Sequence, residues 1–147
     1  MMKRIRILEQ HCVGCGLCEV HCVVQHSRSG KIIKAYRDQR DEIVAAVQVE
    51  RSGYESFALQ CRHCEDPLCI EACMTGALYR DPETDAVLCD SERCVGCWMC
   101  IMICPAGAIQ RVPDGSAATK CDLCAGRDVP VCVENCPNEA LVVEDEE

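Results

Sequence analysis

Residues 12–22 read CVGCGLCEVHC, and this stretch decides the fold. Its first three cysteines recur at every third position, and a fourth stands four residues further on. Thiols at this density can form disulfides, bind zinc or bind an iron–sulfur cluster. The chain holds 17 cysteines in 147 residues, so the choice among these chemistries determines how the whole chain folds.

The composition favours metal binding over disulfides. Cysteine makes up about 12% of the chain (17 of 147), a level typical of small secreted disulfide proteins. However, the opening residues MMKRIRILEQHC contain no apolar run and no signal-peptide cleavage site. No apolar run approaches the roughly 18 residues of a membrane span. We therefore expect a cytoplasmic protein without direct membrane insertion, in which clustered cysteines bind metal.

The apolar core is thin, since aromatic residues make up only 3% of the chain and cysteine supplies much of the apolar content. Small chains with weak cores usually need a metal or a crosslink. We expect bound metal to supply part of the folding free energy.

Charge is unevenly distributed in a chain whose formal net charge is −9. Residues 1–40 are basic on balance, and the remainder is strongly acidic. The basic residues are either ordinary solvated surface or a docking face. Few aromatics and an acidic balance exclude nucleic acid as a partner. The candidate docking face consists of Arg28, Lys31, Lys34, Arg37 and Arg40.

The cysteines form a hidden repeat of four groups in the order A-B-A-B. The two A groups share the spacing C-x2-C-x2-C-x3-C and open with the same tetrapeptide, CVGC. The two B groups share C-x2-C, a variable gap and C-x3-C, with proline two residues before the third cysteine and Ala-Leu after the fourth. One cysteine, Cys89, is left over. The groups begin at Cys12, Cys61, Cys94 and Cys121.

Short strand and turn signals lie between the groups. ALYRDPETDAVLCD predicts a hairpin around Asp81–Asp85, AIQRVPDGSAATK a hairpin turning at 113–115, and EIVAAVQVERSGYESFALQ a third near Ser52–Gly53. KRIRIL and EALVVE predict terminal strands. The segment SRSGKIIKAYRDQRDE is compatible with a loop or a short basic helix, and a single helical turn is expected after each fourth cysteine. The result is an α+β chain of short hairpins and loops.

The spacing of the A groups indicates iron–sulfur clusters. Structural zinc sites usually take two separated pairs of ligands, which a B group alone could supply. Three cysteines at i, i+3 and i+6 instead wrap around a single bound group. The spacing C-x2-C-x2-C-x3-C-P is that of bacterial ferredoxins, in which the fourth cysteine binds the other cluster. CIMICP at 100–105 supplies its closing segment. The glycines Gly14, Gly16 and Gly96 let backbone N–H groups approach the cluster.

With these motifs the chain, from Arg4 to Val143, resembles the four-cluster ferredoxin-like electron-transfer subunits of complex oxidoreductases. These serve molybdenum and tungsten enzymes such as formate dehydrogenase, dimethyl sulfoxide reductase and aldehyde oxidoreductase, as well as hydrogenases and carbon monoxide dehydrogenase. The segment CEVHCVVQHS is most similar to the short soluble members associated with carbon monoxide dehydrogenase. Two positions depart from the pattern, because Val23 and Met74 follow the fourth cysteines where the run has proline.

The resemblance implies four [4Fe–4S] clusters with crossed ligands. It also implies one compact unit over 1–147, in which two ferredoxin-like modules, each with two clusters, are interleaved. Module one would take about 1–40 plus 115–147, and module two about 55–114. The implied ligand sets are Cys12, Cys15, Cys18 and Cys136 (set 1); Cys22, Cys121, Cys124 and Cys132 (set 2); Cys61, Cys64, Cys69 and Cys104 (set 3); and Cys73, Cys94, Cys97 and Cys100 (set 4).

For the residues outside the ligand sets, we consider a structural role before a functional one. Cys89 is expected to be a buried strand residue, with a reserve ligand or redox thiol as the alternative. Trp98 is expected to pack over a cluster or to anchor a partner. The four histidines adjoin ligand cysteines, but no set lacks a member that histidine would replace. We expect them to donate tuning hydrogen bonds or to lie on ordinary surface. They are His11, His21, His26 and His63.

We find no P-loop, dinucleotide fingerprint or nucleophile–base pair, so no catalytic residue is assigned. The function expected is a non-catalytic electron-transfer subunit in a hetero-oligomer. It would relay single electrons between a catalytic oxidoreductase subunit and a flavoprotein, ferredoxin or other iron–sulfur subunit. A freely diffusing polyferredoxin and a structural zinc-binding interaction module are the alternatives.

Overall fold

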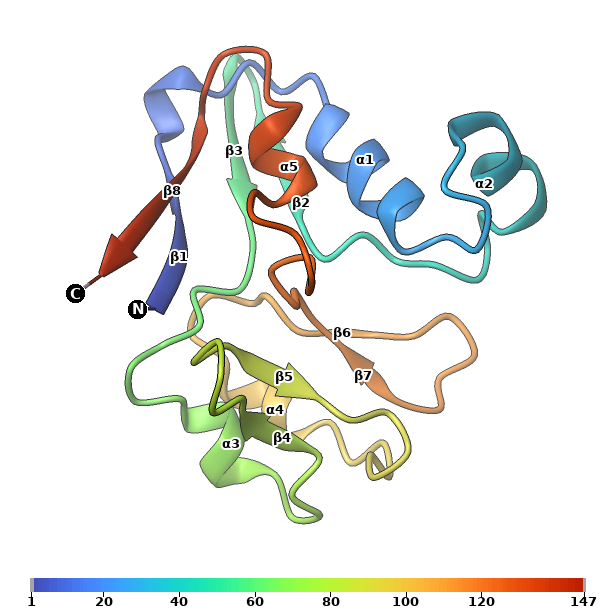
Figure 1. Cartoon of the computed structure of the whole chain (residues 1–147), viewed down its shortest axis with the longest axis vertical. Coiled ribbons are helices and arrows are strands. Elements are labelled where there is room, and N and C mark those ends of the chain that lie inside the picture. Colours follow the sequence, from blue (N-terminus) through green and yellow to red (C-terminus); the bar gives the residue numbers. More distant parts are fainter. Residues whose placement is uncertain (1, 147) are drawn as a thin grey trace.

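The computed structural model describes residues 2–146, and Met1 and Glu147 lie outside the described residues. The chain is α+β, with short helices and strands that pair into two-stranded antiparallel sheets (Figure 1). The strands are β1 (Met2–Ile7), β2 (Gln48–Ser52), β3 (Glu55–Leu59), β4 (Leu78–Arg80), β5 (Val87–Cys89), β6 (Gln110–Arg111), β7 (Ala118–Thr119) and β8 (Leu141–Glu146). The helices are η1 (Glu9–His11), α1 (Leu17–Gln25), α2 (Ile32–Asp38), α3 (Leu68–Ala72), α4 (Met99–Ile103) and α5 (Val131–Glu134).

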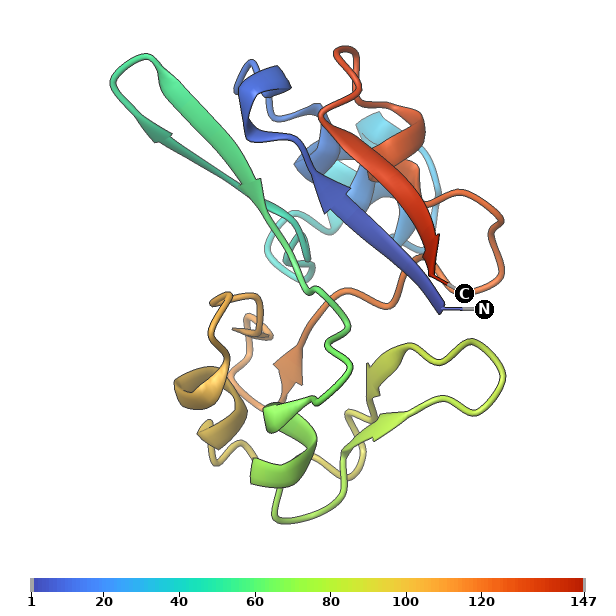
Figure 2. The ribbon, with the colours of Figure 1, turned by 90° about the vertical axis from the view of Figure 1, so that its left-hand side faces the viewer.

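All three predicted hairpins are confirmed. β2 pairs with β3, β4 with β5 and β6 with β7, each in antiparallel register. The turn of the first hairpin contains Gly53 with φ of 62°, a left-handed conformation that glycine adopts without steric cost. The β2–β3 hairpin projects from the body of the molecule in Figure 2.

The two predicted terminal strands pair with each other. Ile5 of β1 lies opposite Val143 of β8, and the N- and C-termini therefore lie side by side (Figure 1). Ile5 and Leu141 are buried beneath this sheet, and α1 packs against α5 beside it. Segments from the two ends of the chain thus build one half of the molecule.

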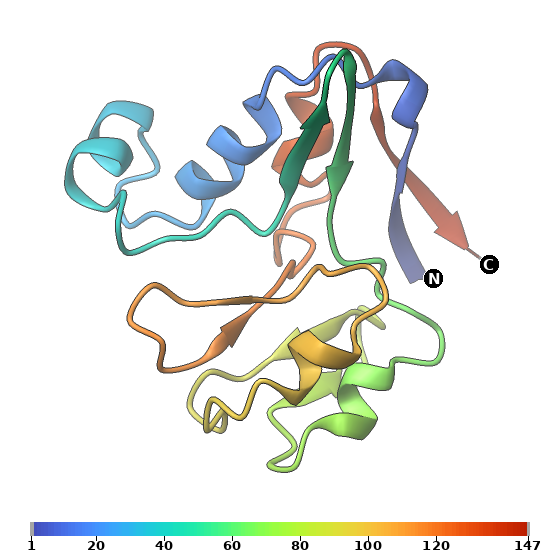
Figure 3. The ribbon, with the colours of Figure 1, turned by 180° about the vertical axis from the view of Figure 1, so that it is seen from behind.

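The middle of the chain builds the other half. α3 and α4 lie side by side there, next to β4–β5 and β6–β7 (Figure 3). A small core joins them, formed by Leu78, Cys100, Ile109 and Ala118.

The sequence predicted a helical turn after each fourth cysteine. In three groups the turn instead ends before that cysteine, and only α1 continues past it, from Cys22 to Gln25. α3 ends at Ala72, before Cys73, and α4 ends at Ile103, before Cys104. The reason is the C-x3-C spacing, since four residues make about one turn of helix and the turn forms between the third and fourth cysteines.

The ambiguous basic segment contains a helix, α2, which packs against α1 through the fully buried Ala35. The basic residues of this segment are exposed, as is Ile33. Among residues 2–146, no helix has the length and apolar character needed to cross a membrane.

Candidate metal centre

Each cysteine group places its third cysteine in the same way, at the second residue of a short helix. The first N–H groups of a helix have no intrahelical acceptor, so they are available to this sulfur. The N–H of Glu19, for example, opposes the burial that raises the pKa of Cys18 to about 11. The cap residues and their cysteines are Gly16 and Cys18, Pro67 and Cys69, Trp98 and Cys100, and Pro130 and Cys132.

The two A groups also share their backbone conformation. Gly14 and Gly96 have φ of 69° and 72°, and the helix caps Gly16 and Trp98 have φ of 75° and 63°. A tryptophan therefore adopts the left-handed conformation that a glycine adopts at the equivalent position. The cysteine spacing, not the residue at the cap, dictates the path of the loop.

The two B groups repeat a different turn. His63 and Leu123 both have a positive φ, of 45° and 56°. In each case the backbone N–H donates to the thiol sulfur two residues earlier, Cys61 or Cys121, over 3.4 Å. The B turn thus directs a backbone donor at the first sulfur of its group.

Three pockets are each lined by four cysteines drawn from two groups. The first is lined by Cys12, Cys15, Cys18 and Cys136. The second is lined by Cys61, Cys64, Cys69 and Cys104. The third is lined by Cys73, Cys94, Cys97 and Cys100, together with Cys89.

The remaining four cysteines also lie near one another, in the half built from the chain ends. Cys22, Cys121 and Cys132 belong to one buried cluster of side chains. Burial, together with the neighbouring Cys124 and Cys22, raises the pKa of Cys132 to about 12. These thiols are therefore neighbours, and Cys18 of set 1 and Cys61 of set 3 lie in the same buried cluster.

The donor chemistry of these sites fits an iron–sulfur cluster. Besides the two B-turn contacts, the N–H groups of Ala46, Ala118 and Ala140 donate to the sulfurs of Cys22, Cys94 and Cys136 over 3.3–3.4 Å. Amide donors to sulfur are the contacts that tune cluster potentials. Because buried thiols with a raised pKa lose their protons only when a cation replaces them, metal binding is also the condition under which these groups become thiolates.

All 17 cysteines are free thiols, and no disulfide joins any of them. Within residues 2–146, no three Cys, His, Asp or Glu side chains are arranged to hold a single metal ion. The thiols of sets 1, 3 and 4 instead line pockets.

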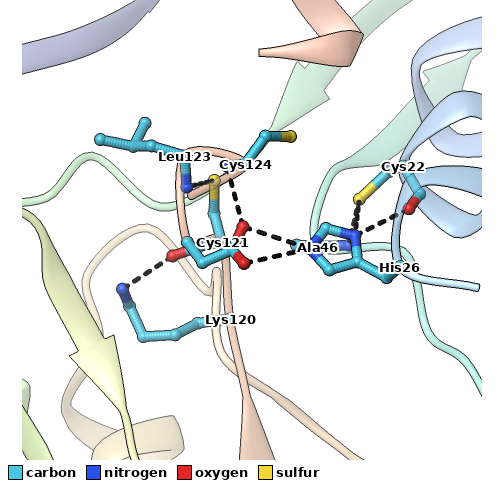
Figure 4. Close-up of polar contacts among 8 residues, drawn as sticks. Cys22, His26, Ala46, Lys120, Cys121, Leu123 and Cys124 are labelled. Atoms are coloured by element: carbon cyan, nitrogen blue, oxygen red, sulfur yellow. Dashed lines mark hydrogen bonds and ion pairs between the residues drawn. The ribbon is translucent and has the colours of Figure 1, made fainter. Parts of the chain in front are cut away.

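Cys22 has a polar neighbour, His26, for which the sequence predicted either a tuning hydrogen bond or ordinary surface. His26 Nδ1 lies 2.8 Å from the Cys22 carbonyl oxygen and 3.8 Å from its sulfur (Figure 4). Its other ring nitrogen, Nε2, lies 3.1 Å from Asp122 Oδ1. His26 therefore links the first cysteine group to the fourth. Of the other histidines, His63 is buried and accepts the Val87 N–H at Nδ1.

Cys89 and Trp98 both adjoin the pocket of set 4. Cys89 is the last residue of β5, half-buried, and its thiol donates to the Ala118 carbonyl over 3.6 Å. It therefore behaves as a strand residue. Trp98 is half-buried in the pocket lining, with the Arg111 guanidinium 4.6 Å from its ring centre.

Two residues that matter at these sites gave no signal in the sequence. Lys120 is buried and lines the pocket of set 3. Gln60 is buried too, and its Oε1 lies 3.9 Å from the Cys132 sulfur. Their positions next to Cys121 and Cys61 are the only hint, because burial of a polar side chain depends on segments far away in the chain.

Comparison with known proteins agrees with this chemistry. The chain is 36% identical to AegA of Escherichia coli (strain K12) over 149 residues, a match that covers 96% of this chain and 22% of AegA. It is 35% identical to the electron transport protein HydN of the same organism over 150 residues, covering 91% of this chain and 83% of HydN. The chain thus spans most of HydN but about a fifth of AegA.

A solved structure has the same fold. A chain of the active site complex BamBC of benzoyl coenzyme A reductase, as isolated, superimposes with a TM-score of 0.53 at 25% identity, covering 97% of this chain and 76% of that chain. Residues 52–146 match the model of the 4Fe-4S dicluster domain. The protein therefore belongs to the 4Fe-4S dicluster domain family and is an iron–sulfur electron-transfer protein.

Proposed function

We propose that the chain holds four [4Fe–4S] clusters and relays single electrons between a catalytic oxidoreductase subunit and a second redox partner. The observation that carries this proposal is the pooling of cysteines from two groups in each of three pockets, with the last four thiols gathered beside them. The bound clusters would supply reversible one-electron chemistry. The sixteen cysteines would hold them in sets 1 to 4 as defined above.

The proposed modules are interleaved, with module one from about 1–40 plus 115–147 and module two from about 55–114. The pairing of β1 with β8 and the packing of α1 on α5 support module one. The packing of α3 on α4 supports module two. Since sets 1 and 2 each take cysteines from both ends of the chain, module one would not hold its clusters if either of its two segments were removed.

Sets 1 and 4 are proposed as the points where electrons arrive and leave. Of the 17 cysteines, only Cys15 and Cys97 are exposed, one in each of these sets. An exposed valine accompanies each of them, Val13 with 65% and Val95 with 66% of its surface accessible. Sets 2 and 3 would connect the two ends.

The second partner would be a flavoprotein, a ferredoxin or another iron–sulfur subunit. The likeness to a chain of an active site complex supports a catalytic subunit as the first partner. The name of HydN supports electron transport as the role. The expected cytoplasmic location stays a prediction.

The decisive experiment is iron and acid-labile sulfide analysis of the chain purified without oxygen. We expect about 16 iron atoms and about 16 sulfides per chain, with absorbance near 400 nm that bleaches on reduction. Zinc without sulfide would instead establish the structural zinc module. Purification from the native cells separates the subunit from a freely diffusing polyferredoxin, because a monomer without a stoichiometric partner would contradict the subunit assignment.

A further inference from the structure

Buried polar residues gather between sets 2 and 3, where an electron would cross from one half of the molecule to the other. Among residues 2–146, four polar or charged side chains are buried, and three of them, Gln60, His63 and Lys120, lie beside these two sets. Gln60 precedes Cys61 of set 3 and contacts Cys132 of set 2. Lys120 precedes Cys121 of set 2 and lines the pocket of set 3.

All three side chains present N–H donors at this place. His63 Nδ1 accepts the Val87 N–H, so its Nε2 carries the ring proton. This Nε2 and the Nε2 of Gln60 are buried and have no partner among the described residues. Unpaired buried donors are costly unless something negative accepts from them. Their concentration at one place points to a negatively charged acceptor.

Lys120 contributes a full positive charge there. Its side chain is 8% exposed, and Nζ donates to the backbone carbonyl oxygens of Val87 and Cys121, the latter over 3.1 Å (Figure 4). Within residues 2–146, no carboxylate forms an ion pair with Lys120. A buried charge without a counter-ion is expensive, so a negative group close by must account for its retention.

The charge of Lys120 acts on both neighbouring sets. Its Nζ contacts the Cys121 carbonyl oxygen of set 2, and its side chain lines the pocket of set 3. The pocket of set 4 differs, because the residues that line it are uncharged. The other charged residues of the set 3 pocket, Arg62 and Asp66, are exposed and of opposite sign. Lys120 is therefore the buried charge that distinguishes set 3.

We propose that Lys120 raises the reduction potential of the cluster held by set 3 above that of the cluster held by set 4, so that an electron crossing the molecule is most stable at its centre. Reduction adds one negative charge to a cluster, and a fixed positive charge in a poorly solvated place favours that change. Lys120 is thus a tuning residue and not a ligand. This inference rests on the proposed function, since it requires clusters in both sets.

The test is a redox titration of Lys120→Met in the full chain, followed by electron paramagnetic resonance. Cys69→Ser identifies the signal of set 3 beforehand. At an applied potential near the wild-type midpoint, we expect the ratio of reduced to oxidised set 3 cluster to fall about tenfold, a shift of about 59 mV for one electron. The signal assigned to set 4 should move much less.

The matched control is Lys34→Met, which removes the same charge from the exposed face of α2. It should leave the set 3 midpoint unchanged, as should Lys120→Arg, which keeps the charge. If the Lys120→Met variant does not retain its iron, Lys120→Gln is titrated in its place, because the glutamine amide can still donate an N–H to the Val87 carbonyl. A fully loaded neutral variant with an unchanged midpoint overturns the role of Lys120. Wild-type iron far from about 16 per chain overturns the proposed function itself.

Discussion

The first and third cysteine runs have the same spacing and the same loop, yet they end differently. Residues 12–22 and 94–104 both open with CVGC and have matching left-handed positions. In the first run, α1 continues past Cys22 to Gln25. In the third run, α4 ends at Ile103 and Pro105 follows the last cysteine. In these two runs the spacing fixes the loop, whereas the helix continues where valine follows the fourth cysteine and ends where proline follows it.

This explains why Val23 stands where the ferredoxin run has proline. Proline inside a helix removes a hydrogen bond and clashes with the preceding turn. Val23 is 8% exposed and lies within α1, so a proline here would break a helix that packs against α2 and α5. The departure from the pattern is therefore a consequence of the longer helix and gives no reason to exclude Cys22 from its set.

The two runs also differ in what covers them. Arg51 and Ser56, from the β2–β3 hairpin, donate to the carbonyls of Gly14 and Cys12 in the first run. In the third run, Trp98 packs against Gly96 and stacks with Arg111. One loop is thus held by a hairpin from outside, and the other by its own tryptophan.

The largest expected effect comes from paired cysteine substitutions that separate ligands of one run. Cys12→Ser with Cys136→Ser should remove one cluster, about 4 of 16 iron atoms, because both belong to set 1. Cys12→Ser with Cys22→Ser should remove two clusters, about 8 iron atoms, although these cysteines are close in sequence. Iron and sulfide analysis after anaerobic purification measures both.

The third run provides the matched control for this prediction. Cys97→Ser paired with Cys73→Ser should lose one cluster, and paired with Cys104→Ser it should lose two. The reverse pattern, in which Cys97→Ser with Cys104→Ser loses one cluster and Cys97→Ser with Cys73→Ser loses two, would show that the ligands are not crossed. In that case each run would serve a single cluster, and the assignment of sets would be wrong.

The sequence predicts the local structure well because local chemistry determines it. Each hairpin turn carries its own signal, such as Gly53 in the first and 113–115 in the third. The alternation in KRIRIL predicts β1, but nothing in it identifies β8 as its partner. That pairing depends on where the rest of the chain brings the two ends.

The surroundings of the cysteines could not be read from the sequence. Lys120 reads as an ordinary surface lysine, yet it is buried and its Nζ donates to the Val87 carbonyl of β5, 33 residues away in the chain. Arg51 reads as part of an exposed hairpin, and its contact with Gly14 spans 37 residues of chain. Cysteine spacing specifies ligands, whereas the groups that surround them come from segments with no spacing rule.

The second prediction compares alanine at the equivalent glycines of the two runs. Gly14 and Gly96 have similar φ, so alanine meets the same backbone strain at both. A Cβ at Gly14 would also lie 3.1 Å from Ser56 Cβ, whereas at Gly96 the nearest atom is a Trp98 ring carbon at 3.4 Å. We expect Gly14→Ala to lower the melting temperature by roughly 6 °C and Gly96→Ala by roughly 3 °C.

Ser56→Gly removes the two closest contacts at the first run and leaves Arg51 Nε, on a flexible side chain, at 3.3 Å. In the Ser56→Gly background, Gly14→Ala should lower the melting temperature by no more than Gly96→Ala lowers it in the wild type. If the two alanine variants melt at the same temperature from the start, the hairpin does not constrain the first loop more tightly than Trp98 constrains the third.

The third prediction concerns the helix caps, Gly16 and Trp98, which share a left-handed conformation. Alanine normally exceeds glycine in helix stability, but a side chain at positive φ costs roughly 1 kcal/mol. Trp98→Gly should therefore be more stable than Trp98→Ala by about 1 kcal/mol, although both lose the ring. Thermal melting of the loaded protein ranks the two, and the reverse order would mean that the loop relaxes when the tryptophan is removed.

The smallest effect is expected from the arginines that cover the two runs. Arg51 Nε and Nη2 donate to the Gly14 carbonyl over 2.9 and 2.6 Å, while Arg111 stacks on Trp98 at 4.6 Å. Both arginines are exposed, so solvent weakens both contacts. We expect Arg51→Ala to lower the free energy of unfolding by about 1 kcal/mol, because it removes a charge-assisted hydrogen bond. Arg111→Ala should lower it by about 0.5 kcal/mol, because it removes a cation–π contact.

The readout for the two arginines is the rate at which a chelator removes iron, because it reports on each loop separately. Arg51→Ala should speed the loss of the set 1 signal and leave set 4 unchanged, since the Gly14 carbonyl lies in the loop between Cys12 and Cys15. Arg111→Ala should speed the loss of the set 4 signal, to a smaller extent, and leave set 1 unchanged. Lys34→Ala, which removes an exposed charge on α2 remote from both loops in the sequence, is the control and should change neither rate. Equal acceleration of both signals by either arginine variant would mean that the two loops open together, and the contrast between a hairpin-held and a tryptophan-held run would then have no consequence for cluster retention.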